Sequence, residues 1–407
     1  MKIRSITYFC TPGWPLNDKI LRLAGSFLQE ARTIFTEAGY EVQTTRLATT
    51  PFPKMLQKMT DVPALARTLD RLLPELGVDY AALGPALPAI PESYPVIPEA
   101  IATSENVFFS ALMADRQNGL DLTAICRCAE IIVRLAPVES NGFANLRFAA
   151  LANVLPGAPF FPAAYHAGGE PAFALAMEAA DIAVDAFENA KTVEQGRQAL
   201  ISALDDHTRS LCKAADFLKY KHMLKFGGID WSLAPFPSER QSLGAAFECM
   251  GVPAIGLQGS LAAAAILAEA VERADFPRAG FSGLMLPVLE DAVLARRAAE
   301  GILSVKDLLL YSAVCGTGLD TVPLPGDVTA EQVAALLLDL SALALRLDKP
   351  LTARLMPIPG KKAGEPTNFD FAFFANSKVM ALEAKSIGSA LASKETLTLQ
   401  MRPARMP

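Results

Sequence analysis

Residues 1–47 have the sequence MKIRSITYFCTPGWPLNDKILRLAGSFLQEARTIFTEAGYEVQTTRL, and this stretch indicates the fold class. Residues 3–9 and 41–47 are rich in β-prone side chains, which predicts two strands. Residues 20–38 between them have apolar side chains at helical spacing. A strand, a helix and a second strand in this order predict a βα unit in a mostly parallel sheet.

The same alternation recurs along the whole chain. Further β-prone runs lie at residues 78–83, 107–111, 146–154, 228–234, 252–257, 281–288 and 352–358, and helical spacing is found at residues 172–189 and 262–274, among others. Several runs lack polar alternation, which predicts strands buried on both faces, as in a barrel. No linker or fixed-period repeat divides the sequence. We therefore expect one α/β barrel domain over residues 1–407, with about ten strands instead of the usual eight.

Composition excludes several classes of protein. The 407 residues are 51% hydrophobic and 20% charged, with a net charge of -6, so the chain can form a large core and lacks the basic block of a nucleic-acid binder. No apolar stretch resembles a signal peptide or spans a bilayer. The six cysteines have no repeated spacing, which is typical of reduced thiols. We expect a cytoplasmic protein without nucleic-acid or membrane partners, and the sequence leaves homo-oligomer formation open.

The common cofactor and metal motifs are missing from the sequence. It contains no Gly-x-Gly-x-x-Gly after a strand, no Gly-x4-Gly-Lys-Ser/Thr, no His-Glu-x-x-His and no paired Cys-x-x-Cys. Gly-x-Ser-x-Gly, the serine-hydrolase motif, is also absent. We therefore expect a small-molecule substrate and neither a cofactor nor a metal.

The segment YSAVCGTGLD, residues 311–320, is the first candidate site. An apolar run leads to Cys315, and Gly316 and Gly318 permit a tight turn and close approach of a ligand to the backbone. Asp320 follows five positions later. This pattern predicts a thiol at the tip of a loop. The alternative is a buried cysteine beside a turn, which is common for free cysteines.

A second candidate is His166, which ends a proline-rich stretch and is followed by Glu170. A histidine in such a loop is suited to general base or acid catalysis, with Glu170 orienting it. The alternative is a surface histidine with Glu170 near a helix N-terminus.

Four further residues are weaker candidates. Asp230 lies in an apolar run with Ser232, and burying this carboxylate is costly unless it is paired. A site and a structural hydrogen-bond network explain this pair equally well. Asn153 leads into the proline-rich stretch, and Lys361 lies in a basic, glycine-bounded loop where it either binds an anionic substrate or faces solvent.

Four groups of residues carry a resemblance to a known family. They are Asn153 with residues 156–170, residues 229–235, residues 314–325, and residues 351–364 with 375–377. Together they resemble the family of unknown function DUF711, also called uncharacterised protein family 0210. The resemblance implies the fold of the pyruvate formate-lyase and anaerobic ribonucleotide reductase barrels, in which ten strands in two halves surround a finger loop carrying a cysteine. Cys315 lies where that cysteine would be.

The sequence departs from the glycyl radical enzymes of this fold. Near its C-terminus it has no Arg-Val-x-Gly-type radical motif, and Cys315 has no adjacent second cysteine. We therefore expect an enzyme that performs non-radical polar chemistry on a small carboxylate- or carbonyl-bearing metabolite. Cys315 would be nucleophile or acid, His166 the general base, and Asp230 or Asp320 the orienting carboxylate.

The remaining candidates would bind the substrate: Asn153, Glu170, Ser232, Gly316, Gly318 and Lys361. We expect the loops of residues 156–170, 230–235 and 315–320 to meet around one pocket. Two alternatives stay open. One is a catalytically inactive barrel that binds a metabolite or a partner protein. The other is a radical enzyme activated by a separate glycyl-radical subunit.

Overall fold

A computed structural model describes residues 1–315 and 317–402. Its strands form one mixed sheet with the order β8-β7-β1-β2-β3-β4-β6-β10-β9, and the short β5 and β11 attach beside β4. Neighbouring strands are parallel along this path except at β1/β7 and β6/β10. The strands are β1 (Lys2–Cys10), β2 (Val42–Thr49), β3 (Tyr80–Ala86), β4 (Val107–Asp115), β5 (Gly119–Asp121), β6 (Phe148–Ala152), β7 (Ala172–Glu178), β8 (Lys225–Ala234), β9 (Gly318–Pro325), β10 (Leu351–Ile358) and β11 (Thr396–Leu397).

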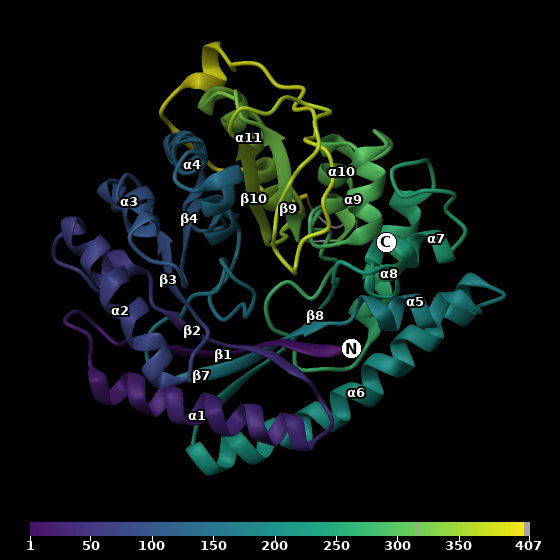
Figure 1. The fold of residues 1–407 in the computed structure, drawn as a ribbon, viewed down its shortest axis with the longest axis horizontal. Coiled ribbons are helices and arrows are strands. Elements are labelled where there is room, and N and C mark those ends of the chain that lie inside the picture. The colour runs from purple at the N-terminus through teal and green to yellow at the C-terminus, as the bar shows by residue number, and fades with distance from the viewer. Residues whose placement is uncertain (316, 403–407) are drawn as a thin grey trace.

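The sheet is barrel-like, and its ladder of paired strands is open between β8 and β9. Figure 1 shows β1 and β7 lying across the lower part of the view, and β9 and β10 standing almost upright above them. Residues 277–288 lie between the two end strands: Ile229 N donates to Pro277 O (2.8 Å), Met285 N to Ser232 O (2.9 Å) and Val288 N to Asp320 O (3.0 Å). Residues 281–288 of this segment were expected to form a strand. Pro277 and Pro287 lack the N–H that a continuous ladder needs, so the segment makes only isolated bonds.

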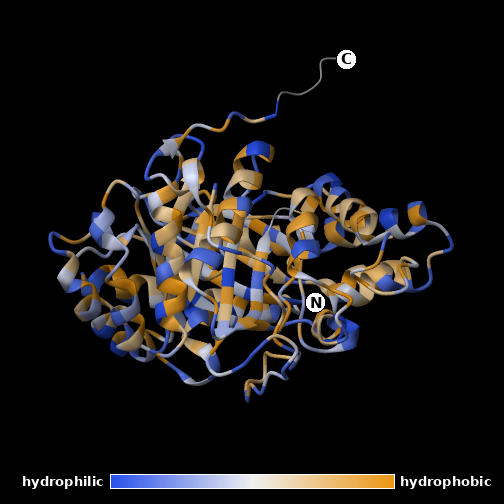
Figure 2. Ribbon diagram, turned by 90° about the horizontal axis from the view of Figure 1, so that it is seen from above, coloured by the Kyte–Doolittle hydropathy of each residue, from blue (hydrophilic) through white to orange (hydrophobic). Residues whose placement is uncertain are grey.

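Helices cover the outer face of the sheet. They are α1 (Asp18–Glu37), α2 (Val62–Leu76), α3 (Ile97–Ala102), α4 (Leu122–Leu135), α5 (Ala180–Glu188), α6 (Val193–His222), α7 (Leu243–Cys249), α8 (Ser260–Arg273), α9 (Ala292–Ala299), α10 (Val305–Cys315) and α11 (Ala330–Leu347). Figure 2 shows that they carry both apolar and polar residues, as amphipathic helices do. Their apolar sides and the outward strand residues form the main core. In the described part of the chain, every helix is too short or too polar to cross a bilayer.

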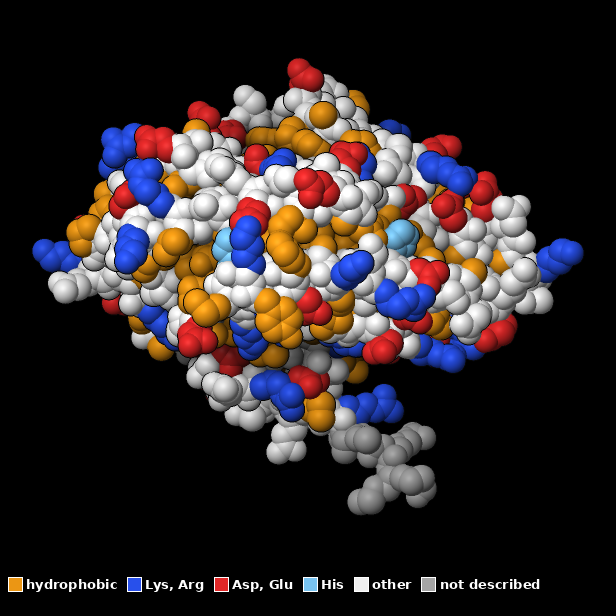
Figure 3. Space-filling view, turned by 90° about the horizontal axis from the view of Figure 1, so that it is seen from below, with side chains coloured by type: hydrophobic (Ala, Val, Ile, Leu, Met, Phe, Trp, Pro, Cys, Tyr) orange, Lys and Arg blue, Asp and Glu red, His pale blue; other side chains and the backbone are white. Residues whose placement is uncertain are grey.

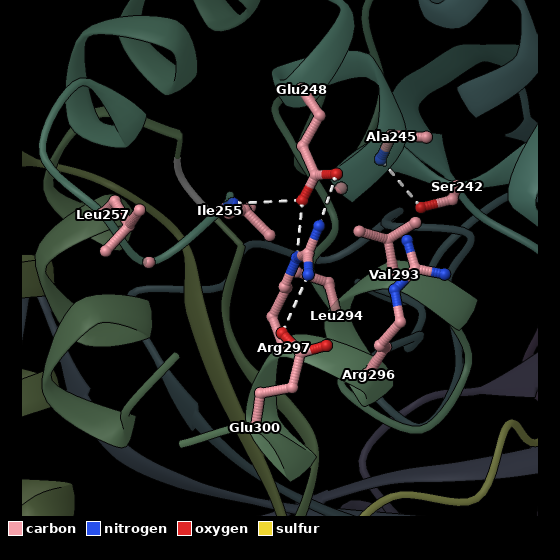
Figure 4. A network of polar contacts seen from close by, with 12 residues as sticks. Ser242, Ala245, Glu248, Ile255, Leu257, Val293, Leu294, Arg296, Arg297 and Glu300 are labelled. Carbon is pink, nitrogen blue, oxygen red and sulfur yellow. Dashed lines mark hydrogen bonds and ion pairs between the residues drawn. The ribbon is translucent and has the colours of Figure 1, made fainter. Parts of the chain in front are cut away.

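Two further segments differ from the sequence-based expectation. Residues 172–178, expected to be helical, form β7, because Phe173, Leu175 and Met177 pack in the outer core while small residues face inward. Residues 252–257, expected to be a strand, connect α7 to α8. Figure 4 shows the network that holds this connection: Glu248 accepts from Ile255 N (3.3 Å) and pairs with Arg297 (2.8 and 2.9 Å).

The connection between β6 and β7 fills the inside of the sheet. We call residues 154–166 the plug. Phe161 of the plug packs against a patch of small residues that includes Ala48, Ala82 and Ala174. The Ser5 and Thr7 hydroxyls of β1 donate to the carbonyl of Pro159 (3.3 and 3.0 Å). Ala158, Ala163 and Tyr165 of the plug pack against β4 and β6. Phe160 packs against β7 and β8. The internal loop is therefore the plug, which contains no cysteine.

Candidate functional site

A row of ion-paired side chains with alternating charge lies on the inner face of the sheet. Arg4 of β1 pairs with Glu178 of β7 (3.2 Å) and with Glu290, which precedes α9. Arg354 of β10 pairs with the other oxygen of Glu290 (2.7 Å) and with Asp320 of β9. All these side chains are at least four-fifths buried, so the strands bring together charges that are far apart in sequence.

Arg46 of β2 lies beside this row of charged side chains, and its surroundings differ from theirs. Its side chain is 7% exposed, and its Nε donates to Thr44 Oγ1 at 2.9 Å. The guanidinium carbon lies 5.0 Å from the ring centre of Phe161 and 5.8 Å from that of Tyr80. Among the residues that the structure describes, no carboxylate pairs with Arg46. Burial, followed by repulsion from Arg4, lowers the pKa of Arg46 to about 9, which reflects an unfavourable environment for its charge.

The three arginines border a cavity of about 90 Å³. We call it the arginine cavity. Its polar wall consists of Arg4, Arg46, Arg354, Glu290, Gln43 and Thr44, and its apolar wall of Tyr80, Phe108, Leu146, Phe160, Phe161, Met285, Phe371 and Phe373. This combination is typical of small-molecule sites, in which a few polar groups orient a ligand inside an apolar pocket.

The three carboxylates of the cluster differ in how strongly their surroundings favour the charged form. Burial opposes the charge of Glu290, but Arg354 and Arg4 outweigh burial and lower its pKa. Burial raises the pKa of Asp320, and repulsion by Glu290 adds to the rise. Burial also raises the pKa of Glu178, whose Oε1 has no hydrogen-bond partner within the part of the chain that the structure describes. Arg354 and Arg4 therefore favour the charged form of Glu290, and three cationic side chains border the cavity.

His166 and Glu170 lie in a different pocket, at the opposite ends of β1 and β7. This His166 pocket has a volume of about 840 Å³ and is lined by residues 155–157, 166–168, 170 and 278–282, among others. His166 is 6% exposed, and its Nε2 has no hydrogen-bond partner among the described residues. Burial lowers the pKa of His166, which favours the neutral ring. Glu170 is exposed at the rim.

Asp230 and Ser232 hold the wall of the His166 pocket. Asp230 is fully buried and accepts hydrogen bonds from Ser232 Oγ (2.5 Å), Phe281 N (2.7 Å) and Ser282 N (2.9 Å). Burial raises the pKa of Asp230 to about 6. Its Oδ2 lies 2.1 Å from where a side chain on Gly280 would begin. These contacts match the structural-network alternative, and a catalytic role for this pair stays a prediction.

Cys315 is the last residue of helix α10, and not the tip of a loop. It is 3% exposed and packs in the outer core, because the apolar run before it continues as a helix up to the thiol. Burial raises the pKa of the Cys315 thiol, which disfavours the thiolate that a nucleophile needs. Its residue neighbour Gly316 lies outside the described residues. Cys315 lines neither of the two pockets described above, so the three loops do not meet around one of them.

The other sequence candidates have structural surroundings. Gly318 has a φ of +101°, and an added Cβ would lie 2.1 Å from Thr352 O, so the close approach of β10 requires glycine there. Asn153 donates to Asp348 Oδ1 (3.1 Å). Lys361 donates to the carbonyl of Pro366. None of these three lines the arginine cavity or the His166 pocket.

The sequence analysis missed the arginines of the cavity. Arg4, Arg46 and Arg354 each interrupt a β-prone run. A charge in a buried strand is costly unless it is paired, which is the signal that singled out Asp230. The same signal, applied to cations, points to all three.

Comparisons with known proteins agree with the resemblance. Residues 1–377 match the family model described as "Uncharacterised ACR (DUF711)". The chain is 33% identical over 368 residues to a UPF0210 protein of Pyrobaculum arsenaticum, an alignment that covers 82% of this chain and 78% of that one. It is 31% identical over 393 residues to a UPF0210 protein of Pelotomaculum thermopropionicum, with coverages of 91% and 86%.

Proposed function

The chain belongs to the DUF711 family, which is described as uncharacterised, and we propose that it binds a small carboxylate-bearing metabolite in the arginine cavity. The single observation that supports this most is Arg46. It is a buried cation on the cavity wall, and no carboxylate of the described residues forms an ion pair with it; the charge of Glu290 attracts it only from beyond ion-pair distance. Burying an unpaired charge is destabilising, so its retention is explained if a ligand supplies the anion.

Arg46 is also suited to this role by its bonding. Only its Nε has a hydrogen bond to the described protein, so both terminal nitrogens are free to donate. A guanidinium recognises a carboxylate through two parallel N–H···O bonds. Arg4 and Arg354 are held by carboxylates already, and they add positive charge at the cavity wall.

The chemistry available to the bound ligand is polar. Glu290 faces the cavity, but each of its oxygens accepts from an arginine, so its role is to position Arg4 and Arg354. Asp320, whose pKa is raised by burial against the opposing effect of Arg354, is joined to the cavity through Arg354. In this proposal Cys315 and His166 do not contact the ligand.

Calorimetric titration with sodium acetate tests the proposal. The wild type, Arg46→Gln and a control, Arg67→Gln, are titrated at constant ionic strength with chloride as the reference anion. Arg67 is exposed on α2 and outside the cavity. A hydrogen bond to a charged group is worth about 1.5–3 kcal/mol, so Arg46→Gln should bind acetate about 10–100-fold more weakly, while Arg67→Gln binds it like the wild type. Absence of binding to the wild type, or equal binding to Arg46→Gln, would contradict the proposal.

A further inference from the structure

We infer that Phe371 and Phe373 set the size of the ligand that the arginine cavity accepts, and that they restrict it to carboxylates whose apolar part is smaller than a benzene ring. This inference rests on the proposed function and adds the substrate class. Both residues come from a segment that follows β10, far in sequence from Arg4 and Arg46.

The two phenylalanines are presented by a hairpin-like strap, residues 364–380. Its two arms are joined by Thr367 N donating to Ser377 O (2.9 Å), Val379 N to Glu365 O (2.9 Å) and Gly364 N to Val379 O (2.8 Å). Near the tip, Asn376 Oδ1 accepts from Phe369 N at 2.8 Å. These bonds fix the arms, so the tip at residues 370–374 has a defined position over the cavity.

The strap is fastened to the rest of the protein beside the cavity. Ala375 N donates to Leu289 O at 2.6 Å, directly before the cavity residue Glu290. The Phe371 ring packs edge-on to Phe143 at 5.1 Å, and Phe373 packs edge-on to Phe236 at 5.9 Å. These contacts therefore hold the strap in place beside the cavity.

The side chains of the tip alternate between cavity and solvent. Phe371 and Phe373 line the cavity and are half-buried, whereas Asp370 and Ala372 are exposed. Their rings lie 5.3 Å apart and form a continuous part of the apolar wall. A carboxylate held by Arg46 therefore has its apolar part enclosed by this wall.

The volume of the cavity limits that apolar part. The cavity measures about 90 Å³. An apolar cavity of about 150 Å³ takes benzene. We therefore expect acetate and propionate to fit beside Arg46, and benzoate to fit only if its ring extends out of the cavity, the strap moves or a phenylalanine is shortened.

Competition calorimetry with acetate, propionate and benzoate tests this inference in the full chain. Phe371→Ala and Phe373→Ala remove parts of the wall, Phe373→Leu is a milder change in case a strap variant fails to fold, and Ala372→Ser alters an exposed strap residue as the control. We expect the wild type and Ala372→Ser to bind acetate and propionate at least about tenfold more tightly than benzoate, a typical discrimination for a few carbons in a fixed pocket. In Phe371→Ala or Phe373→Ala this preference should fall by about tenfold.

The outcomes separate the two proposals. Tight benzoate binding to the wild type, or an unchanged preference in all folded phenylalanine variants, overturns the size-selection inference while acetate binding through Arg46 still stands. If no carboxylate binds the wild type, or if binding does not depend on Arg46, the proposed function fails and the inference fails with it.

Discussion

Replacing Arg46 with methionine should stabilise the protein without ligand and destabilise it relative to the wild type with ligand. Burial lowers the pKa of Arg46 from 12.5 to about 9. A pKa that is lower by one corresponds to about 1.4 kcal/mol, so the buried charge costs several kcal/mol. Methionine removes this cost and fills similar space. Thr44 Oγ1, which loses Arg46 as a partner, still donates to Arg4 O at 2.7 Å, so the change leaves no orphaned hydroxyl.

The lost contacts offset part of the gain. Each cation–π contact of Arg46, with Phe161 and with Tyr80, is worth about 0.5–2 kcal/mol. Replacing buried charges with apolar residues of similar volume is often stabilising by about 1–4 kcal/mol. We therefore expect a net increase in the free energy of unfolding of about 1–2 kcal/mol for Arg46→Met without ligand.

Urea unfolding, followed by the fluorescence of the buried Trp231, measures this change. With acetate at 100 times its dissociation constant, the wild type should gain about 2.7 kcal/mol and Arg46→Met nothing, so that the order of the two midpoints reverses. The exposed control Arg67→Met should change by less than about 0.5 kcal/mol in both conditions. If Arg46→Met is destabilised by more than about 1 kcal/mol without ligand, Arg46 is a structural residue and the reasoning is refuted.

Three further predictions concern residues outside the arginine cavity. Because burial raises the pKa of Asp230 to about 6, above its unfolded value of 3.8, this carboxyl stabilises the fold at low pH and loses that contribution as the pH rises. The stability advantage of the wild type over Asp230→Asn in urea should thus be about 1 kcal/mol larger at pH 5 than at pH 7, and an equal advantage at both pH values would contradict this. Gly318→Ala should lower the free energy of unfolding by more than about 3 kcal/mol, since its Cβ would overlap the β10 backbone at a φ of +101°, and a loss below about 1 kcal/mol would show that the two strands can separate. Iodoacetamide should label exposed Cys126 and Cys249 well before Cys315, as followed by peptide mass spectrometry, whereas rapid labelling of Cys315 at neutral pH would restore its role as a nucleophile.

The strands could be predicted where burial and β-prone residues coincide. The runs at residues 3–9, 107–111, 228–234 and 352–358 lie in strands, and those at 41–47 and 78–83 overlap strands that begin one and two residues later. The strand β7 was missed because its inner side chains are small: Ala174 and Ala176 leave room for the plug, and alternating alanines carry no strand signal of their own. The run at residues 281–288 was wrongly expected to pair fully, because flanking prolines and glycines interrupt its hydrogen bonds.

The site could be predicted less well, for a physical reason. His166 and Glu170 do share a pocket, as their spacing in one loop suggested. Arg46 and Arg354 are 308 positions apart, and only the sheet order brings β2 and β10 around one interior. Local motifs cannot encode such a juxtaposition. The sequence does show each charged residue inside a β-prone run. This pattern indicates a candidate site residue for cations as well as for anions.

A crystal structure of the wild type soaked in sodium acetate tests the central claim most directly. The account predicts planar density in the arginine cavity, with both carboxylate oxygens within hydrogen-bond distance of the terminal nitrogens of Arg46. The same soak of Arg46→Gln should leave that position without acetate. Acetate bound only elsewhere, for example in the His166 pocket, or an arginine cavity without acetate in the wild type, would contradict the account.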